Sequence, residues 1–145
     1  MLTTPLTALE AASASMTVKV SLTSADVVLL TSGAAASIYP GFNETNTFPA
    51  GFYLVDAVAV VKTAFAGGAG TLTFGVADGT NQILAAGTDM TTAGVMAGYN
   101  LTKPVVYSAA SKISITVTAG TAITGWTSGE LDIYLNLVNL TALNR

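Results

Sequence analysis

Short runs in which apolar and polar residues alternate constrain this chain more than any other feature of its sequence. The run MTVKVSL at residues 16–22 alternates throughout, and so does ELDIYLNLV at residues 130–138. Successive side chains of a β-strand point to opposite faces, so a period of two indicates strands that bury one face. Glycine-rich or Asn/Asp-containing turns separate the runs, and helix-period patterns are scarce. The sequence therefore predicts an all-β fold.

Eight segments carry the strand pattern. They are residues 16–22, 27–30, 52–65, 71–76, 81–86, 104–107, 112–118 and 130–138. Segment 52–65 is mainly apolar on both faces, so this strand is expected to be central in its sheet or to lie under a partner. A glycine-rich turn and then the hairpin dipeptide Asp78-Gly79 follow it, so we expect residues 52–86 to form a three-strand meander. Residues 31–48 and 87–103 are expected to be loops.

The length of 145 residues fits one domain. Eight or nine short strands with some long connections suit an antiparallel two-sheet sandwich of the jelly-roll type. We expect residues 16–145 to form this single β-sandwich domain and residues 1–15 to form an N-terminal arm. The arm carries Leu2, Leu6 and Leu9 at spacings of four and three. It is either a frayed terminus or a segment that docks on a neighbouring molecule.

Charged side chains are scarce, at 9% of the chain against about 25% in an average soluble domain. The net charge is −3 and the five basic residues are scattered, so the chain lacks the clustered Lys and Arg that nucleic acid or an anionic membrane requires. The apolar stretches are too interrupted for a membrane-spanning helix, and the N-terminus lacks the pattern of a secretory signal. We expect a protein made in a cytoplasm, with no nucleic-acid partner and no membrane.

The scarcity of charge also bears on function. Charge depletion is typical of the core of a protein–protein interface, and the outward strand positions of this chain are mostly Thr, Ser, Ala and Asn. We therefore favour a protein that works docked to copies of itself or to another subunit. The alternative is a neutral, threonine-rich surface domain.

Histidine and cysteine are both absent, which removes the usual ligand sets for zinc, haem and iron–sulfur clusters. It also removes the Ser-His-Asp and Cys-His nucleophiles. Glu130 and Asp132 are the nearest approach to catalytic residues, because on one strand they would lie about 7 Å apart on the same face, the scale of a glycosidase carboxylate pair. A solvated strand end is the interpretation we favour, so no enzyme activity and no cofactor or metal are expected.

Three further motifs have a structural and a functional interpretation. The segment DGTN at 78–81 offers oxygen ligands for calcium but lacks the spaced acids of a calcium loop, and a hairpin turn explains it. The glycines at 67–70 suit a turn better than a phosphate cradle. Trp126 lies between Gly125 and Gly129 and, with nearby tyrosines, could stack on a sugar. Such a residue more often caps a sandwich core or fills an interface pocket.

The order of these segments resembles the small jelly-roll proteins of tailed-bacteriophage virions, including the head decoration or cement proteins. The resemblance is carried by the strand pattern TVKVSLTSADVVLL, a loop ending in FPAG, the apolar strand YLVDAVAVVKTAF and the segment GGAGTLTFGVADGTNQIL. It covers roughly residues 16–140 and consists of strand and turn patterns. It brings no catalytic residues to this chain.

The resemblance implies a structural virion protein on the capsid surface whose partners are the major capsid protein and copies of itself. Proteins of this kind often form trimers at three-fold or quasi-three-fold positions of the capsid lattice. We expect the subunit interface to involve Val58, Val60 and Val61 on the two-sided apolar strand, with Tyr134 and Val138 on the last strand. The arm residues Leu2, Leu6 and Leu9 are the candidates for contact with the capsid.

Three other functions remain alternatives. A tail or fibre-attachment subunit would have the same fold. A carbohydrate-binding module would use Trp126 and nearby aromatic side chains. A hydrolase using Glu130 and Asp132 is the third.

Overall fold

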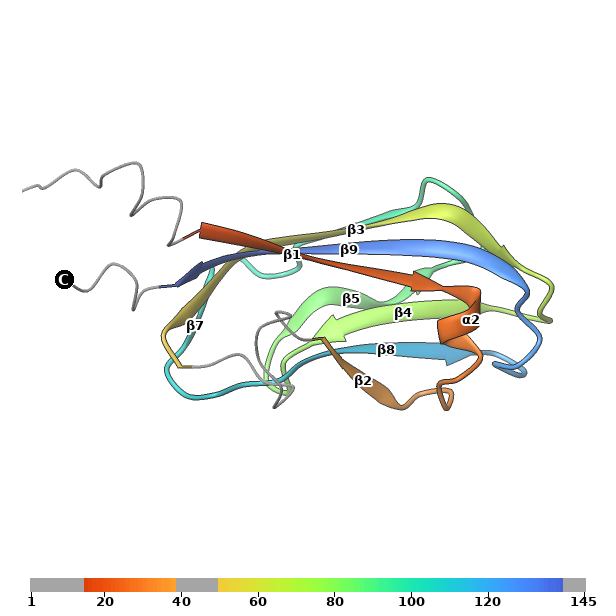
Figure 1. Ribbon diagram of the computed structural model, residues 1–145, viewed down its shortest axis with the longest axis horizontal. Coiled ribbons are helices and arrows are strands. Elements are labelled where there is room, and N and C mark those ends of the chain that lie inside the picture. Colours follow the sequence, from red (N-terminus) through yellow and green to blue (C-terminus); the bar gives the residue numbers. More distant parts are fainter. Residues whose placement is uncertain (1–14, 39–49, 140–145) are drawn as a thin grey trace, which may run out of the picture.

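Nine β-strands and one four-residue helix make up the part of the chain that the structure describes, residues 15–38 and 50–139 of a computed structural model (Figure 1). The strands are β1 (Ser15–Thr23), β2 (Ala35–Ile38), β3 (Phe52–Ala66), β4 (Leu72–Ala77), β5 (Gln82–Asp89), β6 (Met96–Gly98), β7 (Val105–Tyr107), β8 (Ile113–Ala119) and β9 (Ser128–Asn139). The helix is α2 (Ser24–Val27).

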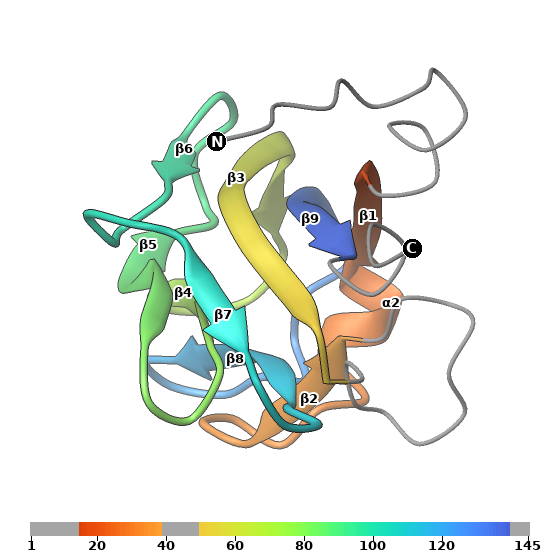
Figure 2. The ribbon, with the colours of Figure 1, turned by 90° about the vertical axis from the view of Figure 1, so that its left-hand side faces the viewer.

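The strands form two antiparallel sheets that lie face to face (Figures 1 and 2). Sheet A has the order β1-β9-β3-β6, with β7 also paired to β3, and sheet B has the order β2-β8-β4-β5. The chain crosses repeatedly between the sheets, and this strand order is that of a jelly roll. The predicted all-β, two-sheet sandwich is confirmed.

One apolar core fills the space between the sheets, and strand alternation explains its membership. Every second side chain of β9 points inward and is buried, namely Leu131, Ile133, Leu135 and Leu137. Strand β8 supplies Ile113, Ile115 and Val117 from the opposite sheet in the same way. Strand β3 lies between β9 and the short strands β6 and β7, which confirms the prediction of a central strand for segment 52–65.

The predicted meander over residues 52–86 is wrong. Strands β4 and β5 do form a hairpin, but β3 belongs to the other sheet and pairs with β9 over most of its length. The glycine-rich turn after β3 carries the chain from sheet A to sheet B. Local alternation cannot distinguish a turn that closes a hairpin from one that changes sheets, because both need the same turn residues.

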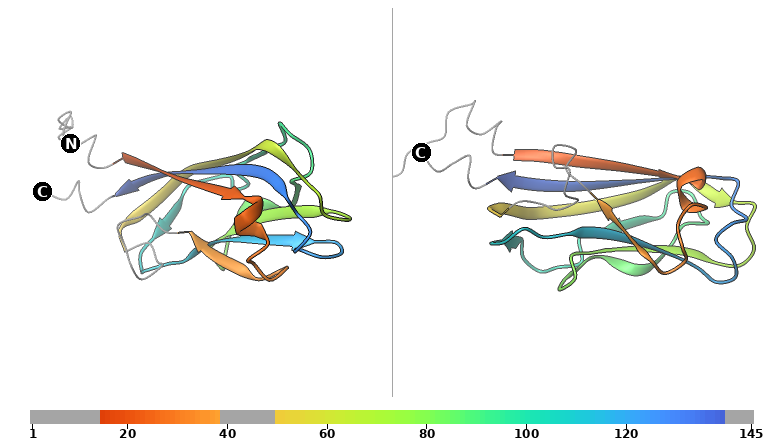
Figure 3. Two further views of the ribbon diagram at one scale, coloured as in Figure 1. Left: turned by 45° about the vertical axis from the view of Figure 1, so that its right-hand side comes forward. Right: turned by 60° about the horizontal axis from the view of Figure 1, so that its bottom comes forward.

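The predicted strand at 27–30 is also wrong. Thr23 and Asp26 form a capping box in which the Asp26 carboxylate accepts hydrogen bonds from the Thr23 backbone N–H (2.9 Å) and hydroxyl (2.8 Å). This turns the chain into α2 directly after β1 (Figure 3). The predicted loops 31–48 and 87–103 contain the short strands β2 and β6, and residues 39–49 lie outside the described part.

The predicted boundary between the N-terminal arm and the sandwich domain, after residue 15, lies at the start of the described residues. Strand β1 begins at Ser15, and residues 1–14 lie outside the described part. Among the described residues, no helix is long and apolar enough to cross a membrane.

Two glycines allow aromatic rings to close one end of the core. A β-carbon on Gly68 would fall on the ring of Trp126, and one on Gly129 would fall on the ring of Phe65. Both rings are buried, with 4% and 2% of their surface exposed. The predicted role of the turn glycines therefore extends to close packing against aromatic side chains.

We expect Gly68→Ala to lower the free energy of unfolding by about 1–3 kcal/mol, because the added methyl group forces the Trp126 ring out of its packed position. Chemical denaturation followed by Trp126 fluorescence measures the change. Gly98→Ala is the matched control, since a β-carbon there meets open space. Equal stability of the two variants would contradict this packing.

Candidate docking face

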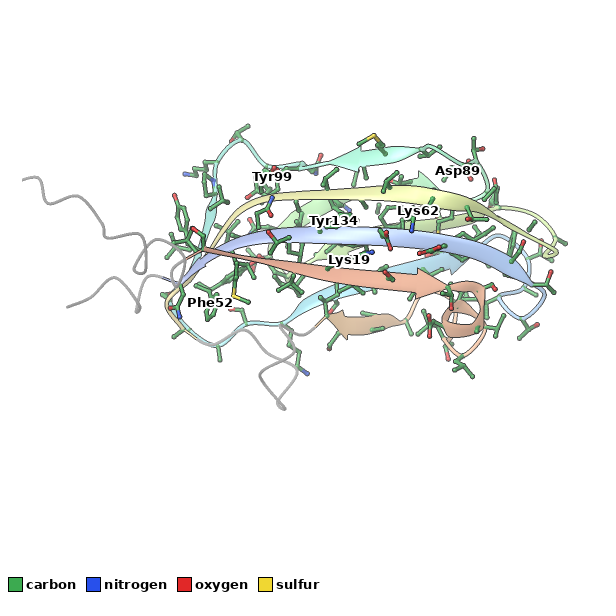
Figure 4. All side chains as sticks on the ribbon, turned by 45° about the horizontal axis from the view of Figure 1, so that its top comes forward. Lys19, Phe52, Lys62, Asp89, Tyr99 and Tyr134 are labelled. Atoms are coloured by element: carbon green, nitrogen blue, oxygen red, sulfur yellow. The ribbon has the colours of Figure 1, made fainter. Side chains whose placement is uncertain are left out.

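The outer face of sheet A combines half-buried apolar side chains with most of the charged groups found on the strands. Register places three rows of outward residues side by side across β1, β9 and β3. These rows are Thr17–Asn136–Asp56, Lys19–Tyr134–Val58 and Ser21–Asp132–Val60. Figure 4 shows Lys19, Tyr134 and Lys62 on this face.

The apolar part of this face includes side chains that a free monomer exposes to water. Val58, Val60, Tyr134 and Val138 are half-buried, and Met96, next to Val60 on β6, is 66% exposed. Exposed Val55 interrupts the pairing of β3 with β9, at a register shift between Leu54 and Asp56. These residues come from strands that are distant in sequence, and the register of sheet A brings them together.

Asp132 is the centre of an ion-pair network on the same face. Its Oδ2 atom lies 3.1 Å from Lys19 Nζ and 3.6 Å from Lys62 Nζ, and its Oδ1 atom accepts a hydrogen bond of 2.6 Å from Ser21. Lys62 also pairs with Glu130 at 3.1 Å. These neighbours cover Asp132 so completely that only 1% of its surface is exposed, although it lies on the outer side of the sheet.

The network stabilises the ionised form of Asp132. Burial acts to raise the pKa of this carboxyl, but hydrogen bonds from Ser21 and Lys19 and the charges of both lysines outweigh it and hold the pKa below its usual value. The hydrogen bond to Asp132 raises the pKa of Lys19, and the hydrogen bond to Glu130 raises that of Lys62. Asp132 and the two lysines are therefore charged at neutral pH.

The charges of this network cancel, and that determines what the face can do. Two lysines balance two carboxylates, and the Lys19 ammonium also lies 5.8 Å from the centre of the Tyr134 ring. A face whose ionic groups are already paired can be covered by another protein surface without needing counter-charges from it. Asp56 is the exception on this face: it is exposed and forms no ion pair within the described residues, and its carboxylate accepts a hydrogen bond from the Ala57 N–H (2.8 Å).

The structure brings together four of the five residues predicted for the subunit interface. Val58, Val60, Tyr134 and Val138 all lie on the outer face of sheet A. Val61 points the other way, into the core, and is 1% exposed. Alternation along β3 requires this, since Val60 and Val61 cannot share a face. The capsid-contact candidates Leu2, Leu6 and Leu9 lie outside the described residues.

Glu130 and Asp132 do lie on one face, as the sequence predicted, but each is engaged by lysine. The network that holds them was not foreseen. Lys19, Lys62 and Asp132 are each visible in the sequence as charges on strands, yet their meeting depends on β9 lying between β1 and β3. No local sequence pattern indicates that β9 lies next to both β1 and β3.

A hollow of about 220 Å³ beside Asp78 and Tyr107 is a second candidate site. Asp78 accepts hydrogen bonds from the backbone N–H groups of Thr80 (2.9 Å) and Asn81 (2.6 Å) and from the Tyr107 hydroxyl (3.0 Å). Burial acts to raise the pKa of Asp78, but these hydrogen bonds outweigh it and lower the pKa. The carboxylate thus organises the turn between β4 and β5. In the described part of the chain, no three potential metal-ligating side chains cluster.

Trp126 does not provide a platform for a sugar. Its ring is buried against Gly68 at one end of the core, and its indole N–H is buried without a partner among the described residues. Stacking on a sugar requires an exposed ring face. The prediction of Trp126 as a glycan contact is therefore wrong, and the alternative role, a cap on the sandwich core, fits its position.

Comparison with known proteins gives one informative likeness. No family model matches the chain, and no curated protein matches it in sequence. Among solved structures, a chain of the "Cyanophage Pam1 capsid asymmetric unit" has a similar fold, with a TM-score of 0.60 and 15% sequence identity. The alignment covers 95% of this chain and 92% of that chain. At this identity, the likeness shows a shared fold.

We expect Asp132→Asn to lower the free energy of unfolding at pH 7 by about 1–3 kcal/mol, because charge-assisted hydrogen bonds within a covered site are lost. The folded-state pKa of Asp132 lies below its unfolded value of about 3.9, so its contribution is full above that pH and is lost as pH falls through the folded pKa. The difference in free energy of unfolding between wild type and variant should become smaller below about pH 4.

Urea denaturation at a series of pH values measures this gap. Glu130→Gln is the control, because the Glu130–Lys62 pair is more exposed and its loss should matter less. A gap that stays constant from pH 7 to pH 2 would contradict the role assigned to Asp132.

Proposed function

We propose that this chain is a non-enzymatic structural component of a phage virion, a decoration or cement subunit that binds the major capsid protein on the capsid surface. The likeness to a chain of a capsid asymmetric unit is the observation that carries the proposal. The alignment spans nearly all of both chains, so the two proteins share one whole sandwich of similar length. The strand and turn patterns of the sequence support the same role.

The outer face of sheet A is the surface we propose for contact between subunits. It combines Val58, Val60, Tyr134 and Val138 with an ion-pair network that leaves little unpaired charge. Strands β1, β9 and β3 have 9, 12 and 15 residues. At about 3.3 Å per residue and about 4.8 Å between strands they present roughly 570 Å², below the about 800 Å² per partner of a standard interface. Val61 takes no part, because it lies in the core.

A homotrimer is the assembly that we propose. A three-fold arrangement offers the same patch to each surrounding capsid subunit, so contacts that are modest singly add through effective concentration. The arm residues Leu2, Leu6 and Leu9 stay the candidates for contact with the capsid. A rigid sandwich suits simultaneous contact with several capsid subunits, because it has little conformational freedom to lose on docking.

Mass spectrometry of purified virions from the source phage tests the role. A decoration subunit that occupies the lattice should be present in hundreds of copies per particle, in a fixed ratio to the major capsid protein. A dozen copies or fewer would indicate a vertex or tail component instead. Absence from the particle would contradict a virion role altogether.

We expect Val58→Glu to convert the trimer to a monomer, because it places an unpaired charge in the centre of the outer face of sheet A. Sedimentation at micromolar concentration measures the mass. Leu29→Glu is the matched control: it removes a side chain that is 84% exposed and lies outside the strands of this face, so the trimer should persist. A wild-type monomer would overturn the homotrimer.

A further inference from the structure

Strand β1 forms an open edge of sheet A. Its nine residues pair with β9 on one side, and no described residue pairs with its other side. Along that side the strand presents a row of backbone N–H and C=O groups. Such a row is a template for a further strand unless something blocks it.

The other sheet edges carry features that discourage pairing, and β1 does not. Strands β6 and β7 have three residues each and β2 has four, while β5 is interrupted by two register shifts against β4. Short edge strands and bulges are the usual protections. The register of β1 with β9 runs unbroken from Ser15 to Thr23, and the strand contains no proline.

A lysine in an edge strand can also block pairing, but Lys19 is directed elsewhere. Its ammonium lies 3.1 Å from Asp132, over the outer face of the sheet. The polar side chains on either side of it are turned onto the same face: Thr17 donates to Asn136 (2.9 Å) and Ser21 donates to Asp132 (2.6 Å). The ion-pair network thus removes the one charge that would protect this edge.

The inward side chains of β1 show that the edge is incompletely covered. Val18 and Leu22 are buried, whereas Met16 and Val20 are only half-buried against the core. A strand added beside β1 would bring apolar side chains next to these two.

We propose that β1 pairs with β1 of a second copy in antiparallel orientation around a two-fold axis at Val18, which joins the two copies of sheet A into one continuous sheet. In this register Met16 lies opposite Val20 of the other copy, so the two half-buried apolar positions cover each other. On the outer side Thr17 lies opposite Lys19, and Ser15 lies opposite Ser21.

Two registers shifted toward the end of β1 are less favourable. A two-fold axis at Lys19 would place two lysines directly opposite each other, which is destabilising. An axis at Val20 would place Met16 opposite Ser24, where α2 begins and the strand has ended. The axis at Val18 avoids both.

The pairing is a contact between copies and does not rest on the proposed virion role. It uses the backbone of one edge, whereas the proposed trimer contact uses the outer face. A seven-residue edge is smaller than a standard interface, so we expect it to form at high concentration or between copies held side by side on a surface.

Disulfide trapping tests the register, because the chain has no cysteine of its own. In the double variant Met16→Cys/Val20→Cys, the cysteine at position 16 of one copy should lie opposite the cysteine at position 20 of the second copy. Their Cα atoms would be about 4.5–5.5 Å apart. That distance permits a disulfide. Within one chain the two cysteines lie about 14 Å apart and cannot bond to each other.

The single variants Met16→Cys and Val20→Cys are the matched controls, since like positions would lie about 14 Å apart across the axis. Under mild oxidation at high protein concentration, the double variant should form covalent dimer at least about tenfold faster than either single variant. Equal rates for the three variants, or no dimer from the double variant, would overturn the proposal.

Hydrogen exchange of the unmodified protein provides a test without substitutions. Backbone amides of β1 that point away from β9 should exchange more slowly as protein concentration rises, while amides of the edge strand β5 stay unchanged. Exchange of the β1 amides that is independent of concentration, up to the concentration used for trapping, would contradict the pairing.

Discussion

The packing of β9 between β1 and β3 is the constraint on which the rest of the structure depends. This one strand buries Leu131, Ile133, Leu135 and Leu137 in the core and unites the first and middle strands of the described chain in one sheet. The strand pairs that β9 forms join residues that are distant in sequence. Sheet A is therefore complete only after β9 has paired with both β1 and β3. Non-local pairing of this kind is typical of folds that form slowly.

The outer side of the same three strands shows how a face can be polar and still suit burial. Asp132 lies between Lys19 and Lys62 with its hydrogen-bonding capacity used, so its charge is compensated within the chain. Around it, Val58, Val60 and Tyr134 remain half-exposed to water. An unpaired charge at the position of Asp132 would oppose docking, whereas a balanced network fixes the side chains of the face and adds little net field.

The two contacts with other molecules that we propose both use sheet A. The outer face offers side chains and area, which suits a specific contact between subunits. The β1 edge offers backbone groups, which suits extension of the sheet. The two are linked physically, because the ion pair that neutralises the face also draws Lys19 away from the edge. The jelly-roll fold shared with a cyanophage capsid chain provides a rigid body on which both surfaces are held.

The sequence by itself determined most of the strand segments and, where apolar and polar residues alternate, the side that faces the core, because a period of two in hydrophobicity is a local property of residues such as Ile113, Ile115 and Val117. It also determined that the chain as a whole is poor in charge, at 9% of its residues. The tertiary structure alone decided that β3 leaves its expected hairpin to pair with β9, that 27–30 turns through the Thr23–Asp26 capping box, and that Trp126 is buried. It alone brought Lys19, Lys62 and Asp132 together. These outcomes depend on which strands become neighbours, and that is set by how the whole set of apolar faces can be buried at once.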